Sequence, residues 1–152
     1  MRGIGIILWF LIVTTIGFSQ SYNGSIIRVI DDDTFVFQTQ QGSLKIRMNG
    51  IDAPEHNQPY GKESTEFLDK YLFKNATIKT NGVDRYGRTI ATLFINGQDI
   101  NLLSIKSGSS WHFKKYSSDV DFANAEIDAR NKKIGLWSLS NPIPPWEWRK
   151  MK

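Results

Sequence analysis

The chain has 152 residues, no cysteine and a formal net charge of +4 at pH 7. This length is that of one domain with a core large enough to fold without disulfides, and the missing cysteine excludes both disulfides and lipid attachment after the N-terminal apolar run. The mild basic charge suits a polyanionic partner, but it selects no function by itself.

The N-terminus has the pattern of a secretory signal, because Arg2 precedes an almost wholly apolar stretch over residues 3–18. Small Gly17 and Ser19 suit a signal peptidase, so we predict a signal peptide at 1–19 and a single mature domain at 20–152. A retained membrane anchor is the alternative, although spanning a bilayer takes roughly 20 apolar residues. We expect a protein that is secreted or periplasmic and has no stable membrane association after cleavage.

The first half of the domain reads as strands separated by turn residues. β-branched and aromatic residues predict three strands, over residues 25–30, 34–38 and 44–51. Apolar residues at helical spacing then predict a helix over 61–73. Two more strands are expected over 76–80 and 89–95, and the second ends at the tight-turn dipeptide Asn96-Gly97.

Two helices are predicted after the last strand. Asp99 is placed to cap a helix over 100–107 that stops at Gly108. Ser118 is expected to cap a longer helix that ends near Gly135. Its inward residues are predicted to be Val120, Ala123 and Ile127.

This order of elements predicts an α+β fold, because five short strands are the number that an OB barrel needs. We therefore expect a five-stranded OB-type β-barrel with three helices, and an SH3-like barrel is the alternative. No repeat or linker precedes Asn141. We expect one monomeric domain that holds the whole function.

The third strand contains a change of phase that bears on function. Arg47 and Asp52 are five residues apart, so an unbroken strand would point them to opposite faces. A bulge at Asn49-Gly50 would reset the phase and turn both side chains outward together. A plain surface ion pair is the alternative.

Further acidic residues are expected near this pair. Glu55 follows Pro54, which cannot continue a central strand, so Glu55 should lie on a loop just beyond Asp52. Asp33, at the start of the second strand, is a candidate to approach the same place. Carboxylates with a free carbonyl and water make the hard-oxygen site that Ca²⁺ accepts, whereas an ordinary acidic turn is the alternative for Asp33.

Basic and aromatic residues form two further groups. The run Asp84-Arg85-Tyr86-Gly87-Arg88 precedes the fifth strand, and Arg88 there can hold a phosphate bidentately. An ordinary glycine turn with solvated arginines is the alternative. Tyr116 lies among lysines and can stack on a base. Core packing is an equally good interpretation of the aromatic residues beside it. We read His56 as solvated and His112 as structural.

Four motifs in order resemble the thermonuclease (staphylococcal nuclease) family over residues 26–148. Asp31-Asp32-Asp33-Thr34 is similar to the Asp-Gly-Asp-Thr of the family, and Arg47 followed by Asp52-Ala53-Pro54-Glu55 is similar to its Arg and Asp-Ala-Pro-Glu. The run at 84–88 and Gly135-Leu136-Trp137 complete the set. Residues 144–149, Pro-Pro-Trp-Glu-Trp-Arg, resemble the tail of the shorter bacterial members.

The resemblance implies roles for particular residues. The catalytic set falls on Arg47, Glu55 and Arg88. The Ca²⁺ ligands fall on Asp33, Asp52 and the carbonyl of Ala53. We assign Arg85, Tyr86 and Tyr116 to substrate binding. Asp32 replaces the usual glycine, which suggests a backbone conformation that residues with a Cβ enter reluctantly.

The resemblance implies a Ca²⁺-dependent nuclease that hydrolyses DNA and RNA and leaves 3′-phosphates. A non-catalytic OB-fold module that binds nucleic acid is the main alternative, since fold does not imply function. A structural adaptor in the envelope is the third reading. A module that does not cut has no need for all of Arg47, Glu55, Arg88 and both Asp ligands, so we expect the enzyme.

Overall fold

The computed structural model describes residues 19–31 and 33–151. The expected signal peptide therefore lies, except for its last residue, outside the described part of the chain. Asp32 is also outside the described residues, so the backbone conformation expected there stays a prediction.

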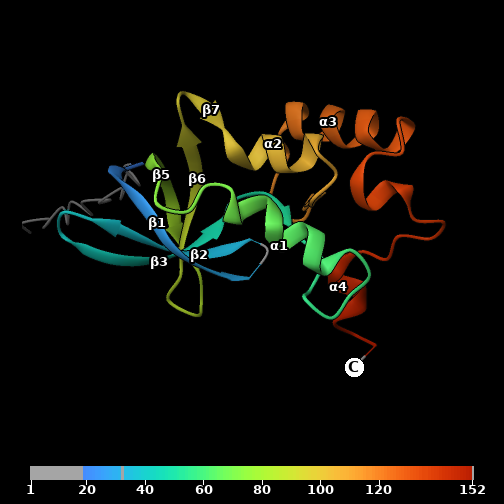
Figure 1. Ribbon diagram of the computed structural model, residues 1–152, viewed down its shortest axis with the longest axis horizontal. Coiled ribbons are helices and arrows are strands. Elements are labelled where there is room, and N and C mark those ends of the chain that lie inside the picture. The colour runs from blue at the N-terminus through green and yellow to red at the C-terminus, as the bar shows by residue number, and fades with distance from the viewer. Residues whose placement is uncertain (1–18, 32, 152) are drawn as a thin grey trace, which may run out of the picture.

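Five antiparallel and parallel strands form a closed barrel (Figure 1). Their bounds are β1 Ser21–Asp31, β2 Thr34–Thr39, β3 Gly42–Met48, β5 Asn75–Val83 and β6 Thr89–Ile95. They pair in the order β3-β2-β1-β5-β6, and a parallel pairing between β3 and β6 closes the sheet. The predicted OB-type barrel is thus confirmed, and the SH3-like alternative is wrong.

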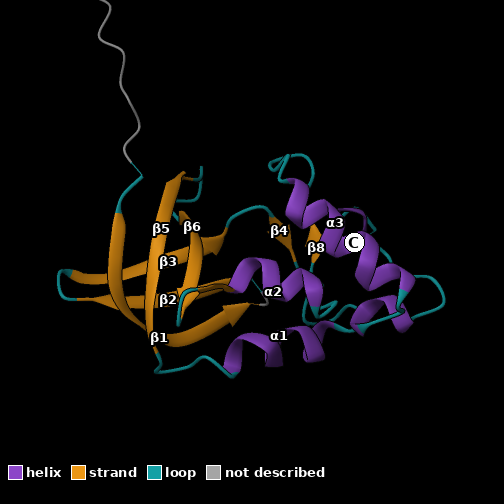
Figure 2. Cartoon of the chain, turned by 90° about the horizontal axis from the view of Figure 1, so that it is seen from above, coloured by secondary structure: helices purple, strands orange, loops and turns teal. Residues whose placement is uncertain are grey.

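Helices and short strands cover one side of the barrel (Figure 2). Three helices are substantial, as predicted: α1 Gly61–Asp69, α2 Ile100–Lys106 and α3 Val120–Asn131. The short elements are β4 Ile51–Asp52, β7 Gln98–Asp99, β8 Trp111–His112, the 3₁₀ helix η1 Gly135–Ser138 and α4 Pro145–Trp148. β4 pairs with β8 as a separate two-stranded sheet beside the barrel.

The barrel encloses the main hydrophobic core. Alternate residues of β2 and β3 point inward, and Phe35, Phe37 and Ile46 are fully buried. A second apolar cluster lies under α3 and contains Trp111, Ala129, Leu136 and Trp137. Trp111 and Trp137 meet edge to face, with ring centroids 4.4 Å apart.

Two helix predictions are wrong in detail. α1 ends at Asp69 rather than residue 73, because Leu72 bridges to Ile26 and Phe73 takes a positive φ of 59°. The α3 prediction also erred, since Asp119 and not Ser118 accepts the first N–H groups.

The buried face of α3 differs from the prediction as well. Val120 and Ile127 are 69% and 55% exposed, and Ala123 is half-buried. The face that turns inward instead carries Phe122, Ala125, Glu126 and Ala129. The helix therefore buries a glutamate and exposes two β-branched residues, which hydrophobicity alone does not anticipate.

The predicted bulge at Asn49-Gly50 is a turn that ends the barrel strand. Gly50 has a φ of 73°, which suits glycine, and the chain leaves β3 to begin β4. The outward orientation predicted for Asp52 is also wrong. Asp52 is 1% exposed, and its carboxylate faces the guanidinium of Arg47 inside the protein.

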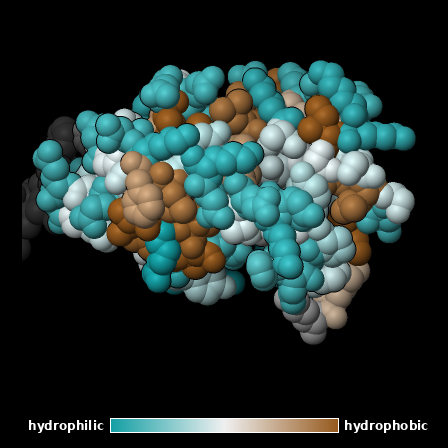
Figure 3. Space-filling model, viewed as in Figure 1, coloured by the Kyte–Doolittle hydropathy of each residue, from teal (hydrophilic) through white to brown (hydrophobic). Residues whose placement is uncertain are grey.

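The face in Figure 3 has an apolar patch over the barrel end, whereas hydrophilic residues dominate over the helical side. Exposed large apolar side chains on β1 and β5 include Ile27, Ile30 and Val83. Within residues 19–31 and 33–151, none of the helices has the length and apolar character needed to cross a membrane.

Candidate active site

The acidic residues meet at one end of the barrel, where β2 begins and β3 ends. Asp33 lies in the turn just before β2, and its carbonyl accepts the N–H of Met48 at 2.9 Å. Arg47 pairs with Thr34 across β2 and β3, which places it beside Asp33. Asp52 returns to the same place from the end of β4.

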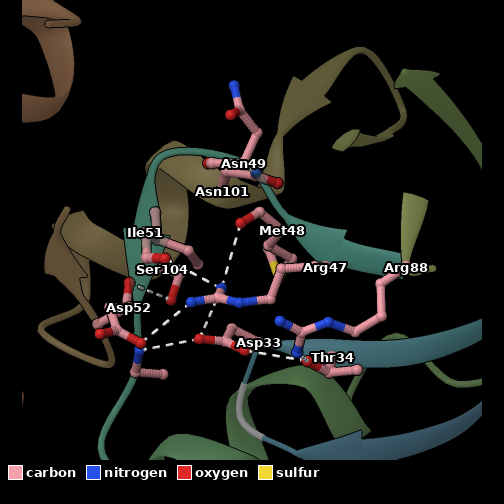
Figure 4. A network of polar contacts seen from close by, with 12 residues as sticks. Asp33, Thr34, Arg47, Met48, Asn49, Ile51, Asp52, Arg88, Asn101 and Ser104 are labelled. Atoms are coloured by element: carbon pink, nitrogen blue, oxygen red, sulfur yellow. Dashed lines mark hydrogen bonds and ion pairs between the residues drawn. The ribbon is translucent and has the colours of Figure 1, made fainter. Parts of the chain in front are cut away.

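The guanidinium of Arg47 holds the two aspartates together (Figure 4). Nη1 is 2.7 Å from Oδ2 of Asp33, and Nη2 is 3.0 Å from Oδ1 of Asp52. Nη1 also donates to the carbonyls of Ile51 at 3.0 Å and Met48 at 3.3 Å. The sequence-predicted pair therefore forms, but inside the protein rather than on its surface.

Burial gives this cluster unusual electrostatics. Asp33 is 6% exposed, and burial is the largest cause that raises its pKa to about 6. Arg47 lowers that pKa, whereas the negative charges of Asp52 and Asp31 raise it. A buried carboxylate with acidic neighbours ionises readily only when positive charge faces it, and a divalent cation is one group that supplies such charge.

A buried asparagine fixes the turn that positions Asp52. Asn101 of α2 is fully buried and donates from Nδ2 to the carbonyls of Asn49 at 3.0 Å and Ala91 at 3.2 Å. Its Oδ1 accepts the N–H of Leu93 at 3.1 Å. The β3–β4 turn is thereby tied to β6, which limits movement of the carboxylate that follows it.

The loop after β4 places the remaining predicted acid. The N–H of Ala53 donates to Oδ2 of Asp33 at 3.2 Å. Glu55 and Gln58 bond reciprocally, because the Glu55 N–H donates to Oε1 of Gln58 at 3.1 Å and the Gln58 N–H donates to the Glu55 carbonyl at 2.7 Å. The Glu55 side chain is 25% exposed, so solvent reaches it at the edge of the site.

Arg88 enters the site from the start of β6. Its Nε is 2.7 Å from Oδ2 of Asp84, and its Nη1 donates to Oγ1 of Thr34 at 3.3 Å. Burial raises the pKa of Asp84, but hydrogen bonds from Arg88 and Tyr86 outweigh it and leave that pKa below its ordinary value. The carboxylate of Asp84 therefore stays ionised and orients the guanidinium toward Asp33 (Figure 4).

The predicted substrate-binding residues divide into two places. Arg85 and Tyr86 lie with Arg88, and Nη2 of Arg85 is 2.6 Å from the hydroxyl of Tyr86. Tyr116 is 66% exposed, and its ring packs against Phe113 at 4.9 Å. The contacts of Tyr116 do not reach the aspartates, so the structure does not bring it into the Arg47 cluster.

The exposure of the two histidines agrees with the prediction of a solvated His56 and a structural His112. His56 is exposed. His112 is 3% exposed, with Nε2 at 3.1 Å from the hydroxyl of Ser117 and its ring against Phe122.

One charged residue of the site was missed by the sequence prediction. Arg149, which follows α4, donates from Nη2 to Oδ2 of Asp52 at 2.7 Å and from Nη1 to Oε1 of Glu55 at 2.7 Å. It belongs to the tail motif at 144–149, which the resemblance had marked without giving it a role. The tryptophan-rich motif just before it was the available signal.

The donor set fits calcium better than a transition metal. The described residues contain no group of three or more His, Cys, Asp or Glu side chains arranged to hold a metal. Asp33 and Asp52 do share the Arg47 guanidinium, and the Ala53 residue between Asp52 and Glu55 adjoins them. Two carboxylates and a carbonyl are hard oxygen donors, so water and substrate would supply the other ligands.

A broad surface hollow lies elsewhere. It has a volume of about 790 Å³ and is lined by residues such as Gly24, Thr39 and Asn96, at the other ends of β1, β2 and β6. Its lining has no charged cluster like that around Arg47. Chemistry rather than size therefore locates the candidate site.

Arginines and carboxylates thus gather at one end of an OB-type barrel. The comparisons give the family: the profile of the staphylococcal nuclease homologues matches residues 45–139. The chain belongs to this family.

Several bacterial and plant proteins are similar to this chain in sequence. A Haemophilus influenzae protein named an uncharacterized endonuclease is 38% identical over 129 residues, which are 84% of this chain and 72% of the relative. An Escherichia coli O157:H7 protein with the same name is 34% identical over 132 residues, 86% of each chain. The staphylococcal-like nuclease CAN1 of Arabidopsis thaliana is 41% identical over 110 residues, 72% of this chain but 34% of its own length.

Proposed function

We propose that this protein is a nuclease that hydrolyses phosphodiester bonds in DNA and RNA and depends on Ca²⁺. The observation that carries the proposal is the Arg47 guanidinium, which joins Asp33 and Asp52 at 2.7 Å and 3.0 Å next to Arg88 and Glu55. Attack on a phosphodiester is promoted by a base for the water and by positive charge near the phosphate oxygens, which arginines and a bound cation can supply. The names of the bacterial relatives support the same reaction class.

The side chains have distinct tasks in the proposed reaction. Glu55 orients a water molecule for in-line attack on phosphorus and accepts its proton, since its carboxylate is open to solvent at the edge of the site. Arg88 donates from Nε to Asp84 and from Nη1 to Thr34, which leaves Nη2 for a phosphate oxygen. Arg47 keeps Nε for the same phosphate while its other nitrogens hold the aspartates.

Ca²⁺ held by Asp33, Asp52 and the Ala53 carbonyl would polarise the phosphate and stabilise the charge that develops on its oxygens. Asp33 and Asp52 are kept at the site by Arg47 and by the Ala53 N–H. Family membership supports calcium over other metals, and we propose on the same ground that the bond to the 5′ oxygen breaks and leaves a 3′-phosphate.

We also propose that the protein acts outside the cytoplasm as a monomer. The charged and apolar pattern of residues 1–19 is the support for export, and the single barrel is the support for a monomer. Substrate contacts beyond the reacting phosphate are assigned to Arg85 and Tyr86, which lie beside Arg88, and to Tyr116.

The test is digestion of plasmid DNA and of RNA by a protein that comprises residues 20–152. Deleting residues 1–19 removes none of the described strands or helices. Cleavage is expected with Ca²⁺ at millimolar concentration, weak cleavage with Mg²⁺, and none with excess chelator, because a site with few fixed ligands suits the larger ion. Glu55→Gln is the control for a contaminating nuclease and should bind DNA without cutting it.

The outcomes separate the competing functions. DNA binding without cleavage under every metal condition would identify a binding module. Full activity in excess chelator would contradict the calcium assignment alone.

A further inference from the structure

The guanidinium of Arg149 bridges two carboxylates to which the proposed function gives different tasks. Nη2 is 2.7 Å from Oδ2 of Asp52, the proposed cation ligand, and Nη1 is 2.7 Å from Oε1 of Glu55, the proposed base. Nη1 also approaches Oδ1 of Asp52 at 3.3 Å. One planar group thus sets the spacing between a ligand and a base that lie three residues apart.

The bridge leaves one oxygen of Glu55 free and shares Asp52 with Arg47. On Asp52, the short bond from Arg149 uses Oδ2, while Oδ1 faces Arg47 and the Asp33 side of the site. On Glu55, Arg149 bonds to Oε1, which leaves Oε2 for water. Glu55 is therefore fixed by one oxygen and keeps the other for the reaction. Both oxygens of Asp52 have guanidinium partners, and Oδ1, which Arg47 and Arg149 approach at 3.0 Å and 3.3 Å, is the oxygen that a cation would share.

The C-terminal segment is anchored on both sides of this bridge. The ring of Trp146 stacks on Phe113, with centroids 5.2 Å apart and planes 8° apart. Nε1 of Trp148 approaches Oδ1 of Asn57 at 3.4 Å, and the buried Gln58 side chain donates to the carbonyl of Ile143. These contacts fix the tail to the residue that follows β8 and to the loop that carries Glu55, so Arg149 arrives at a defined position.

Electrostatics keep Arg149 in place. Burial lowers its pKa, but the hydrogen bonds to Asp52 and Glu55 raise it further, so the net shift is upward and the side chain stays charged. Asp33, Asp52 and Glu55 make three acids, and Arg47 alone would leave them under-compensated. Asp52 is 1% exposed with Arg149 in place, and the Arg149 side chain is 43% exposed, so its loss would replace an oriented guanidinium beside Asp52 with mobile solvent.

We propose that Arg149 is a positioning residue of the active site, which holds Asp52 and Glu55 in the orientation needed for cation binding and water activation. The C-terminal segment thereby completes a site that the barrel alone does not provide. This inference rests on the proposed nuclease function. It predicts that the bridging geometry, and not the positive charge alone, supports catalysis.

The test compares variants of the purified protein at saturating Ca²⁺ and DNA. Arg149→Gln should lower kcat by about 10²-fold with KM close to the wild-type value, because misplacing a catalytic group has roughly this effect. Arg149→Lys should recover little of the loss, since an ammonium cannot reach both carboxylates in a fork. Lys150→Gln is the matched control, because the adjacent residue loses the same charge but pairs only with Glu147.

Two further measurements separate positioning from folding. Guanidinium ion at millimolar concentration should raise kcat of Arg149→Ala in a saturable way and should not raise kcat of Glu55→Gln. Calorimetric titration with Ca²⁺, without substrate, should show a Kd changed by less than about tenfold, because losing a fixed ligand orientation and losing a nearby positive charge have opposite effects.

Different results would contradict the positioning role and the proposed nuclease function. Wild-type kcat in Arg149→Gln, together with Ca²⁺ binding tightened tenfold or more, would show that Arg149 only competes with the cation. Full recovery in Arg149→Lys would show that charge alone matters. A wild-type protein that cleaves no nucleic acid would contradict the proposed function itself, whereas a cleaving wild type with an equally active Arg149→Gln contradicts this inference alone.

Discussion

Arg47 is the residue around which the site is organised, and its surroundings explain why the aspartates are buried. Its side chain is 14% exposed and makes contacts with two carboxylates and two carbonyls. Burying ionised groups is costly unless they are paired and hydrogen-bonded, and well-packed apolar residues would often serve stability as well. This cluster is therefore better explained by a catalytic task than by stability.

Arg88 offers a test of geometry at the level of one side chain. Arg88→Lys keeps the charge but cannot bond Asp84 and Thr34 while also holding a phosphate. We expect kcat on DNA to fall by about 10²-fold, the typical effect of losing one transition-state contact. The folded state should lose little stability, because lysine keeps the positive charge that pairs with Asp84.

The control for this substitution is Arg85→Lys in the same loop. Arg85 is exposed and its contacts are with Tyr86, so its replacement should affect KM more than kcat. Steady-state kinetics of both variants give the comparison. Near wild-type turnover in Arg88→Lys would assign that arginine a structural role.

Sequence reasoning found the residues of the site that lie in local motifs. Arg47 and Asp52 are only five positions apart, so strand phase was enough to predict that they meet, although it placed them on the surface. Arg149 is 97 positions from Asp52 and 94 from Glu55, and no local pattern reports a contact of that kind. Tyr116 was assigned to substrate binding from its aromatic character, and this stays a prediction, because its ring contacts are with Phe113 and Lys115 rather than with the aspartates.

At the level of elements, the strands of the barrel were predictable because each has six or more residues, which is long enough for a sequence pattern to appear. β4, β7 and β8 have two residues each, which is too short for any periodicity to appear. The inward face of α3 was mispredicted because Glu126 is buried there. Its carboxylate is 2.8 Å from Nζ of Lys114 and 3.6 Å from Nη2 of Arg130, partners that lie outside the helical pattern or one turn along it.

The junction between α2 and η1 depends on two glycines that touch. A Cβ on Gly108 would lie 2.2 Å from the carbonyl oxygen of Ile134, and one on Gly135 would lie 2.4 Å from the carbonyl oxygen of Gly108. Both residues also have a positive φ, of 66° and 60°. Helix α2 can therefore reach the second apolar cluster only if these positions lack side chains.

This junction gives a prediction with a matched control. Gly97 has a φ of 76° and no atom within 4 Å of an added Cβ, so Gly97→Ala should cost only the strain of the backbone, about 1 kcal/mol. Gly108→Ala should cost that amount and a further 1–3 kcal/mol or so for the clash. Denaturant unfolding measures both, and equal losses would show that the α2–η1 contact relaxes freely.

Across the whole molecule, two apolar clusters are joined at the small β4–β8 sheet. Ile51 of β4 belongs to the barrel core, Trp111 of β8 belongs to the cluster under α3, and the ring of Trp146 reaches Trp111 at 5.6 Å. The tail, the second cluster and the acidic site are thus parts of one packing arrangement. His112 pairs with Ile51 within this sheet, so its ionisation affects the connection between the two clusters.

Burial lowers the pKa of His112 below its ordinary value of 6.5, and Lys114 acts in the same direction, whereas Glu126, Ser117 and Asp119 raise it. The folded state therefore favours the neutral ring. The stability that follows is fully present above the unfolded pKa of 6.5 and is lost as the pH falls through the lower, folded value. One proton gives a slope of at most about 1.4 kcal/mol per pH unit.

His112→Gln should remove this slope while its amide keeps a bond to Ser117. In chelator, the difference in unfolding free energy between wild type and His112→Gln should shrink on acidification from about pH 7.5 to about pH 5, because only the wild type must protonate a buried ring. Asp33 has the opposite shift, with its pKa raised to about 6, but it is present in both proteins and cancels in the difference. If the difference in unfolding free energy stays constant over this range, His112 is solvated enough to ionise freely in the folded state. The β4–β8 sheet between the two clusters would then be open to water.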